Sequence, residues 1–409
     1  MSGPMTETRV PRGSRVHFGS LDGDLRVERD CQIGVDGRLI VAGQARFDGD
    51  AEVGGDMDCR SFRSDDGTVH VRGHLFVQDD LETRDGEVEV DGELRARNVD
   101  ADRGLTVGGP ATAEKFEVGG KLEGSQTLTA KSVSVGGKFR LAGKLTAGSV
   151  EAGGSVDVQE VDLDSLEAGG VIRVGGGVVR QSVEVGGRFR SEAPFEFGKL
   201  EVGGIAHFQD VAKGGKIEAG GMLEANRDLT FEDLHVGGLG GIDGNGKGRN
   251  VAVGGKFTVK GSLELTGSLE VGGQISVGGP LTGASLEVGG RIDARRAVFS
   301  GEAEIGGVVS TQEGLKAARI SLGRKSRATG PLVGGIVEVD DKGRVEDVYG
   351  DSVELGEKCG ARRVVARRVR IRSGASVDEV IYTESAEVEE GAQLRAPPQK
   401  VATLPAFPL

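Results

Sequence analysis

Apolar and polar residues alternate in short blocks that end at a Gly-Gly pair, and this block recurs along the chain. Between residues 119 and 306 the first glycines of twelve successive pairs are spaced by 16 to 18 residues, with a mean of 17.0. The residues one and three positions before each pair are apolar, as Val135 and Val133 are, while the residue between them is polar in eleven of the twelve copies. This period of two is typical of β-strands with one buried face.

Glycine pairs at a fixed interval predict sharp corners between these strands, because glycine adopts positive φ without steric cost. Short strands, glycine corners and a period of 17 together predict an all-β fold. It is a single-stranded parallel β-helix, or β-solenoid, whose coils place like residues over like. We predict a polar N-terminal tail at 1–15 and a rod of roughly 22 turns at 16–395, on the order of 105 Å long. A proline-rich tail at 396–409 follows, which its prolines keep out of the ladder.

Composition narrows the class of protein further. Of 409 residues, 72 are Gly, 37% are apolar and only 4% are aromatic, so the core must consist of small, mostly β-branched side chains. No apolar run reaches the roughly 20 residues of a membrane-spanning helix, and residues 1–13 do not resemble a secretory signal. Three separated cysteines indicate no disulfide framework, which favours the cytoplasm. A net charge of −13 argues against nucleic acid as a partner.

Motifs for enzyme chemistry are weak in this chain. The segment 241–248 nearly spells a phosphate loop, but it lacks the Ser or Thr that would hold Mg²⁺, and no helix follows. His70 and His74 flank Val-Arg-Gly without an obvious third metal ligand nearby. We therefore expect no enzyme activity, cofactor, nucleotide or metal, although the many acids leave a paired-carboxylate site for glycoside cleavage open.

One charge feature is a column of glutamates on an outward face, named here the acidic column. Adjacent members about 4.8 Å apart would repel each other by roughly 0.9 kcal/mol in water. The column is either a solvated face that keeps rods from adhering side to side or a stripe for divalent cations or a basic partner. Its members are Glu117, Glu151, Glu167, Glu184, Glu201, Glu218, Glu270, Glu287 and Glu304.

A second charge feature, named here the basic cluster, lies near the C-terminal end. It either meets anionic lipid headgroups or the acidic column of another rod, or is neutralised within the molecule by nearby acids. The cluster consists of Arg362, Arg363, Arg367, Arg368, Arg370 and Arg372. The acids that follow it are Asp378, Glu379, Glu384, Glu387, Glu389 and Glu390.

The ends of a solenoid expose unpaired backbone groups and an apolar cross-section that another copy can extend. Leu404, Phe407 and Leu409 in the proline-rich tail are candidates to fold over the last turn as a cap; the alternatives are a free tail or a peptide ligand. The N-terminal dozen residues are too polar for that role. We therefore expect the chain to polymerise with itself through at least one end.

The repeats resemble those of the bactofilins, the polymer-forming cytoskeletal proteins. The resemblance rests on segments such as 131–143, KSVSVGGKFRLAG, and 352–356, SVELG. It implies a right-handed β-helix, nucleotide-independent polymerisation through the rod ends, and a scaffolding role for client proteins, often at the inner face of the membrane. Two other classes stay open. One is the hexapeptide-repeat acyltransferases; the other is exported β-helix proteins that act as adhesins or bind or cleave polysaccharides.

Overall fold

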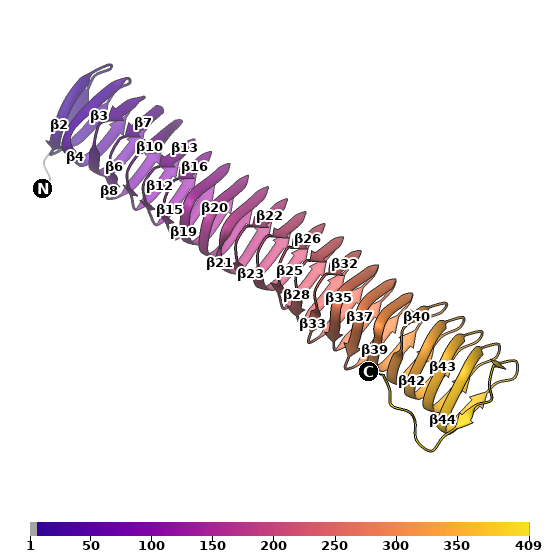
Figure 1. Cartoon of the computed structure of the whole chain (residues 1–409). Helices are drawn as coiled ribbons and strands as arrows, with labels where there is room; N and C mark the ends of the chain where they lie inside the picture. The colour runs from indigo at the N-terminus through magenta and orange to yellow at the C-terminus, as the bar shows by residue number, and fades with distance from the viewer. Residues whose placement is uncertain (1–5, 409) are drawn as a thin grey trace, which may run out of the picture. The chain divides into compact units, whose positions relative to one another are not determined.

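The structure is a computed structural model that describes residues 6–408. The chain divides into two compact units, Met1–Gly203 and Gly204–Leu409, and each unit is a β-solenoid (Figure 1). The described residues contain strands, turns and bends but no helix. Together the two units hold about 23 coils of about 17 residues, which confirms the predicted fold class.

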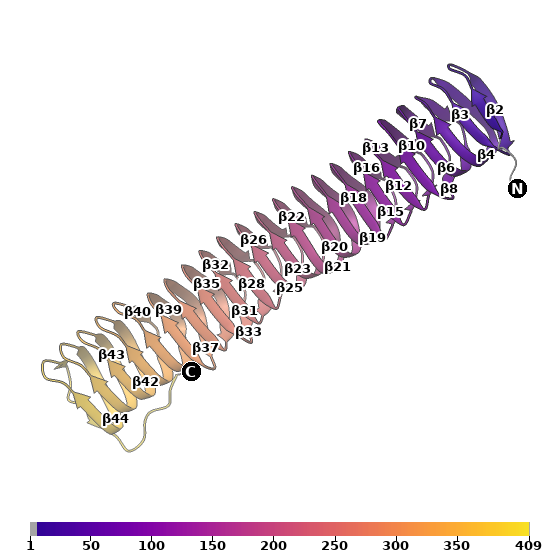
Figure 2. The ribbon, with the colours of Figure 1, turned by 180° about the vertical axis from the view of Figure 1, so that it is seen from behind.

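Each coil consists of three short strands, which define three faces. In one coil of unit 1, β15 (Lys115–Val118) lies on face 1, before the glycine pair; β16 (Lys121–Gly124) lies on face 2 and β17 (Leu128–Thr129) on face 3. β15 pairs in parallel with β18 (Ser132–Val135), the same strand of the next coil. Figure 2 shows β12, β15 and β18 following one another on face 1.

Where the corners are well paired, strands of two or three faces merge into one long strand. The strands that form the terminal coils and the interaction surfaces are, in unit 1, β1 (Glu7–Val10), β2 (Arg15–Leu21), β3 (Asp24–Val27), β4 (Cys31–Phe47), β9 (Asp80–Thr83), β12 (Asn98–Ala101), β19 (Lys138–Ala152), β20 (Ser155–Ala168) and β21 (Val171–Val185). In unit 2 they are β34 (Ser268–Val271), β36 (Ser285–Val288), β38 (Glu302–Ile305), β39 (Val308–Leu322), β41 (Leu332–Val339), β42 (Arg344–Leu355), β43 (Gly360–Ile371), β44 (Ser376–Val388), β45 (Gln393–Leu394) and β46 (Gln399–Lys400).

The core of each unit is a set of columns in which inward side chains lie over one another. On face 1 of unit 1, Phe116 pairs with Val133 in register, Val133 with Val150 and Val150 with Leu166, and all four are at most 2% exposed. Their outward neighbours alternate with them, as the period of two predicts. The columns bury apolar area coil by coil, so each coil is stabilised mainly by the coils next to it.

The glycine pairs have a different physical role from the predicted one. None of the twelve pairs that define the period has positive φ; that conformation occurs at other glycines, such as Gly177 and Gly314. A Cβ atom added at Gly154 would lie 2.5 Å from the carbonyl oxygen of Gly137 in the preceding coil. The prediction that these glycines serve a left-handed corner was therefore wrong: they allow two backbones to approach closely.

The ladder extends further at both ends than predicted. β1 pairs with β3 inside the predicted 1–15 tail, because Thr8 and Val10 already alternate with charged neighbours. Near the other end β46, which lies between Pro398 and Pro405, pairs with β44 inside the predicted 396–409 tail. Its residues keep their N–H groups, so the neighbouring prolines do not prevent pairing.

Candidate interaction surfaces

The acidic column is a continuous stack in parts of both units. Its members are the outward residues of face 1, and most of them are exposed. Ser134 interrupts the stack between Glu117 and Glu151. The register places directly over one another Glu151, Glu167, Glu184 and Glu201 in unit 1, and Glu270, Glu287 and Glu304 in unit 2.

Lysines two residues before the glutamate neutralise some members of the acidic column. Lys115 Nζ lies 2.5 Å from Glu117 Oε2, and Lys199 and Lys216 pair with Glu201 and Glu218 in the same way. At Glu151, Glu167 and Glu184 the corresponding residue is a serine, and these three carboxylates have no ion pair with any described residue. Charge is therefore uncompensated in the middle of unit 1, and Glu270, Glu287 and Glu304 in unit 2 likewise follow no lysine at that position.

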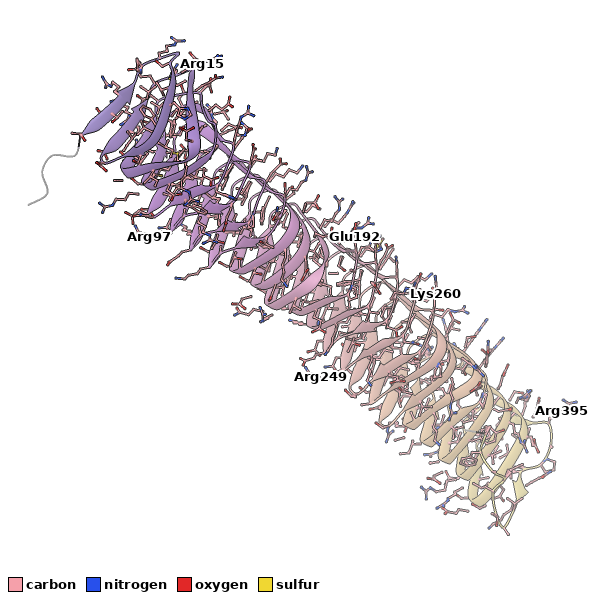
Figure 3. The ribbon with its side chains drawn as sticks, turned by 60° about the vertical axis from the view of Figure 1, so that its left-hand side comes forward. Arg15, Arg97, Glu192, Arg249, Lys260 and Arg395 are labelled. Carbon is pink, nitrogen blue, oxygen red and sulfur yellow. The ribbon has the colours of Figure 1, made fainter. Side chains whose placement is uncertain are left out.

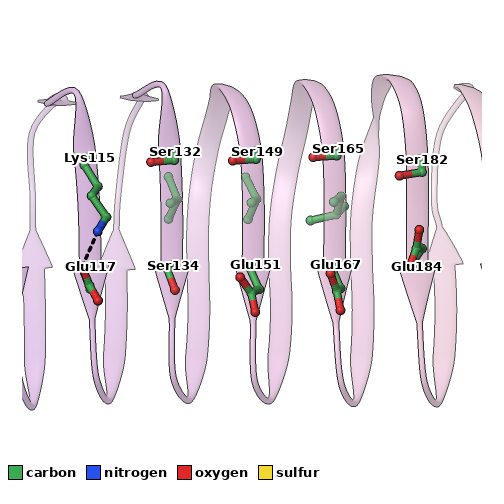
Figure 4. A pocket seen from close by; sticks show the side chains of 13 residues that line it. Lys115, Glu117, Ser132, Ser134, Ser149, Glu151, Ser165, Glu167, Ser182 and Glu184 are labelled. Atoms are coloured by element: carbon green, nitrogen blue, oxygen red, sulfur yellow. Dashed lines mark hydrogen bonds and ion pairs between the residues drawn. The ribbon is translucent and has the colours of Figure 1, made fainter.

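The serines form a second column beside the glutamates, and a shallow groove of about 470 Å³ follows both (Figure 4). The serine column consists of Ser132, Ser149, Ser165 and Ser182, one in each successive coil. Toward the N-terminus the acidic column continues through Asp100 and Glu82, which the sequence pattern missed because no glycine pair follows them. Burial and then the charge of Glu117 raise the pKa of Asp100 above its usual value.

Stacked like charges predict that removing one carboxylate stabilises unit 1. Glu167→Gln should raise the free energy of unfolding by about 0.5 kcal/mol, because Glu151 and Glu184 lie directly before and after it in register. Thermal and urea unfolding at low salt measure the effect, which should shrink in about 1 M NaCl as screening increases. Glu117→Gln is the matched control and should give little or no stabilisation, since it removes the lysine pair together with the repulsion of Asp100. Equal effects of the two substitutions would contradict this account.

The basic cluster is neutralised within unit 2. β43 carries five of the six arginines, and Arg372 directly follows it. β43 pairs on one side with β42 and on the other with β44, both of which carry acids. The N···O distances run from 2.6 to 3.6 Å. Internal neutralisation agrees with the second interpretation of this cluster, but three of the partner acids precede the arginines, and among the described residues Asp378 and Glu390 form no ion pair with them. The pairs are Arg362–Asp347, Arg363–Glu379, Arg367–Asp351, Arg368–Glu384, Arg370–Glu387, Arg372–Glu354 and Arg372–Glu389.

An apolar column on the outside of face 3 was not predicted; it is named here the flank column. It consists of Val333, Tyr349, Val365 and Ile381 in four successive coils, each at most 7% exposed. The C-terminal segment covers it with Val401, Leu404 and Phe407. The ring centroids of Phe407 and Tyr349 lie 5.6 Å apart.

Leu404 and Phe407 therefore lie along the flank of the last coils, whereas we expected them over the last coil as a cap; Leu409 lies outside the described residues. The physical reason is that the flank column offers apolar surface that water would otherwise contact. A sequence signal for it exists: Val348-Tyr349 and Val364-Val365 are apolar doublets that break the alternation. In the coil before Val333 the residue in register with it is Lys316, which is exposed. The flank column therefore begins at Val333, within the stretch that the tail covers.

The terminal coils expose side chains that are buried elsewhere. In the last coil Val388 is 39% exposed, whereas Ile371, its partner in the coil before, is fully buried. In the first coil Val16 is partly exposed, whereas its partner Ile33 is 1% exposed. Among the described residues, β1 and β2 have ladder partners on one side only.

The weaker motifs have internal partners. In the glycine-rich segment, Asp243 pairs with Lys260 at 2.8 Å, and the backbone N–H of Asn245 donates to the Asp228 carboxylate at 2.7 Å, where a phosphate would be repelled. His70 contacts Asp91 at 2.9 Å.

The cysteine thiols are shielded by burial. Burial, followed by the charge of Asp58, raises the pKa of the Cys59 thiol to about 12. Burial likewise raises the pKa of Cys359.

Within residues 6–408, no group of three or more His, Cys, Asp or Glu side chains is arranged to hold a metal ion. The same part of the chain has no helix long and apolar enough to cross a membrane. No family model, curated protein or solved structure matches the chain.

Proposed function

We propose that this protein is a structural scaffold whose copies stack end to end into filaments without nucleotide, as its resemblance to the bactofilins implies. The observation that carries the proposal is the state of the terminal coils. Val16 in the first coil and Val388 in the last are inward residues that remain partly exposed. Their partners in the neighbouring coils, Ile33 and Ile371, are instead buried.

The physics of the interior coils supports stacking between copies. Ile371 is fully buried because the next coil lies over it, and Val388 lacks such a coil. A terminal coil of a second copy would supply apolar cover and also backbone partners for the ladder edge. That terminal coil has the same period and strand pattern as the interior coils, so the contact between copies would resemble the contact between successive coils.

The proposed location is the cytoplasm, with the inner face of the membrane or client proteins as further partners. All three cysteines are buried and unpaired, which supports a reducing compartment. Charged side chains project outward along each unit, as Figure 3 shows for Arg97 in unit 1 and Arg249 in unit 2. Such a surface suits clients or lipid headgroups that recognise charge.

The test is the concentration dependence of mass in nucleotide-free buffer, measured by light scattering and followed by negative-stain microscopy. We expect the purified chain to form filaments, and Val388→Lys or Val16→Lys to suppress them, because a buried lysine at the contact opposes stacking. Leu239→Lys is the matched control: Leu239 is 48% exposed but lies away from both terminal coils, so filaments should persist. A chain that stays monomeric up to its solubility limit would contradict the proposal.

A further inference from the structure

The last complete coil is covered in part by the chain that follows it. β45 pairs with Ser376–Val377 on face 2, and β46 pairs with Ile381–Tyr382 on face 3. On face 1, the segment 385–388 has a ladder partner only on the side of β43 among the described residues. β45 and β46 thus begin a further coil that is never completed.

The chain leaves the ladder where the face 1 strand of that coil would form. The Val401 amide still donates to the Tyr382 carbonyl at 2.8 Å, and then the chain turns back along the flank of unit 2 toward β39 (Figures 1 and 2). Val401, Leu404 and Phe407 follow at intervals of three residues, which is the period of a polyproline II helix. These three side chains contact the flank column, and the residues between them are exposed.

We infer that the outer edge of β44 is an interface for a second copy of this chain and that residues 393–407 compete with that copy for it. This inference rests on the proposed function. The segment acts as a latch in two parts: β45 and β46 occupy the edge, and the contact of Leu404 and Phe407 with the flank column holds them there.

The contacts favour displacement of the latch by a complete coil. β45 and β46 are two residues each, and Val401 makes the last backbone hydrogen bond between the tail and the ladder within the described residues. Leu404 and Phe407 are only partly buried. Segments with few buried contacts and few hydrogen bonds open at low cost. A complete coil would pair along all three faces of β44 and cover Val388, which the latch leaves exposed.

Weakening the apolar part of the latch tests the inference. In the full-length chain, Leu404→Ser with Phe407→Ser should lower the concentration at which filaments appear on the order of tenfold, because the competitor for the edge binds more weakly. The matched control is Ala402→Ser with Ala406→Ser, two exposed positions of the same tail, which should leave that concentration unchanged. Light scattering and negative-stain microscopy provide the readout.

A bare flank column would also promote side-by-side aggregation, so a third variant separates the two effects. Adding Val388→Lys to the Leu404→Ser and Phe407→Ser variant should abolish the gain, because the lysine blocks the edge and not the flank. Assembly that survives Val388→Lys, or an unchanged or higher threshold in the latch variant, overturns the latch. If wild type forms filaments in that case, the proposed function stands without it. If neither wild type nor the latch variant assembles, both fail.

Discussion

Gly154→Ala should destabilise unit 1 by about 2–3 kcal/mol, the range for an added methyl group in a packed site that cannot relax. The added Cβ would lie 2.5 Å from the Gly137 carbonyl oxygen and 3.3 Å from its carbon. Both are backbone atoms held in the ladder, so no side chain can move aside. The coils must separate locally, which weakens the hydrogen bonds between them.

The matched control for this substitution is Gly241→Ala. A Cβ at Gly241 meets only one backbone atom, the Leu223 carbonyl oxygen at 3.9 Å, which is an ordinary contact. Its stability should change by less than about 1 kcal/mol in either direction. Urea unfolding combined with hydrogen exchange of the adjoining coils measures both variants, since repeat proteins lose stability locally. Equal effects at the two glycines would show that coil spacing is not what the paired glycines serve.

Phe139→Ala is expected to cost about 3–5 kcal/mol, the usual loss for a fully buried aromatic side chain. Phe139 is fully buried, and the register places it between Leu122 and Val156 of the neighbouring coils. The backbone ladder fixes the spacing of these coils, so they cannot collapse into the space that the ring leaves. The cavity therefore adds its own cost to the lost burial.

Phe139→Leu separates these two costs. Leucine fills much of the volume, and Leu122 already occupies the same column, so we expect a loss under about 1.5 kcal/mol. The difference in unfolding free energy between the two variants measures the cavity, and hydrogen exchange of β16 and β20 should report it first. A loss for alanine no larger than for leucine would mean that the coils do move together.

The sequence predicts the acidic column well because its members precede a glycine pair at a constant offset. Glu151, Glu167 and Glu184 lie in register as the period requires. Asp100 escaped the pattern because its coil carries Asp102 and Arg103 where the glycine pair would be. Whether a carboxylate of the column has a cation beside it depends on the residue two positions before it in the same strand, as Lys115 is for Glu117.

The position of the latch could not be predicted from the local sequence pattern. The prolines near the C-terminus lie where the regular repeat ends, but β46 still pairs between them, and they do not show where the tail goes. Its place depends on Tyr349 and Val365, which lie about 40 to 60 residues earlier in the sequence and are brought onto one flank only by the stacking of coils. The apolar doublets that contain these residues can be interpreted as an outward apolar column only once face 3 is known.

The sequence by itself determined the period and the inward columns, because each depends on residues at fixed short intervals. Tertiary structure alone decided the reason for the glycine pairs, the ion pairs of β43 and the course of the tail. Each of these depends on atoms of separate coils, or of a coil and the tail, that meet across a few ångströms. A repeat predicts which residues lie in register in successive coils. The distance between two backbones and the surface left uncovered at an end depend on the assembled stack.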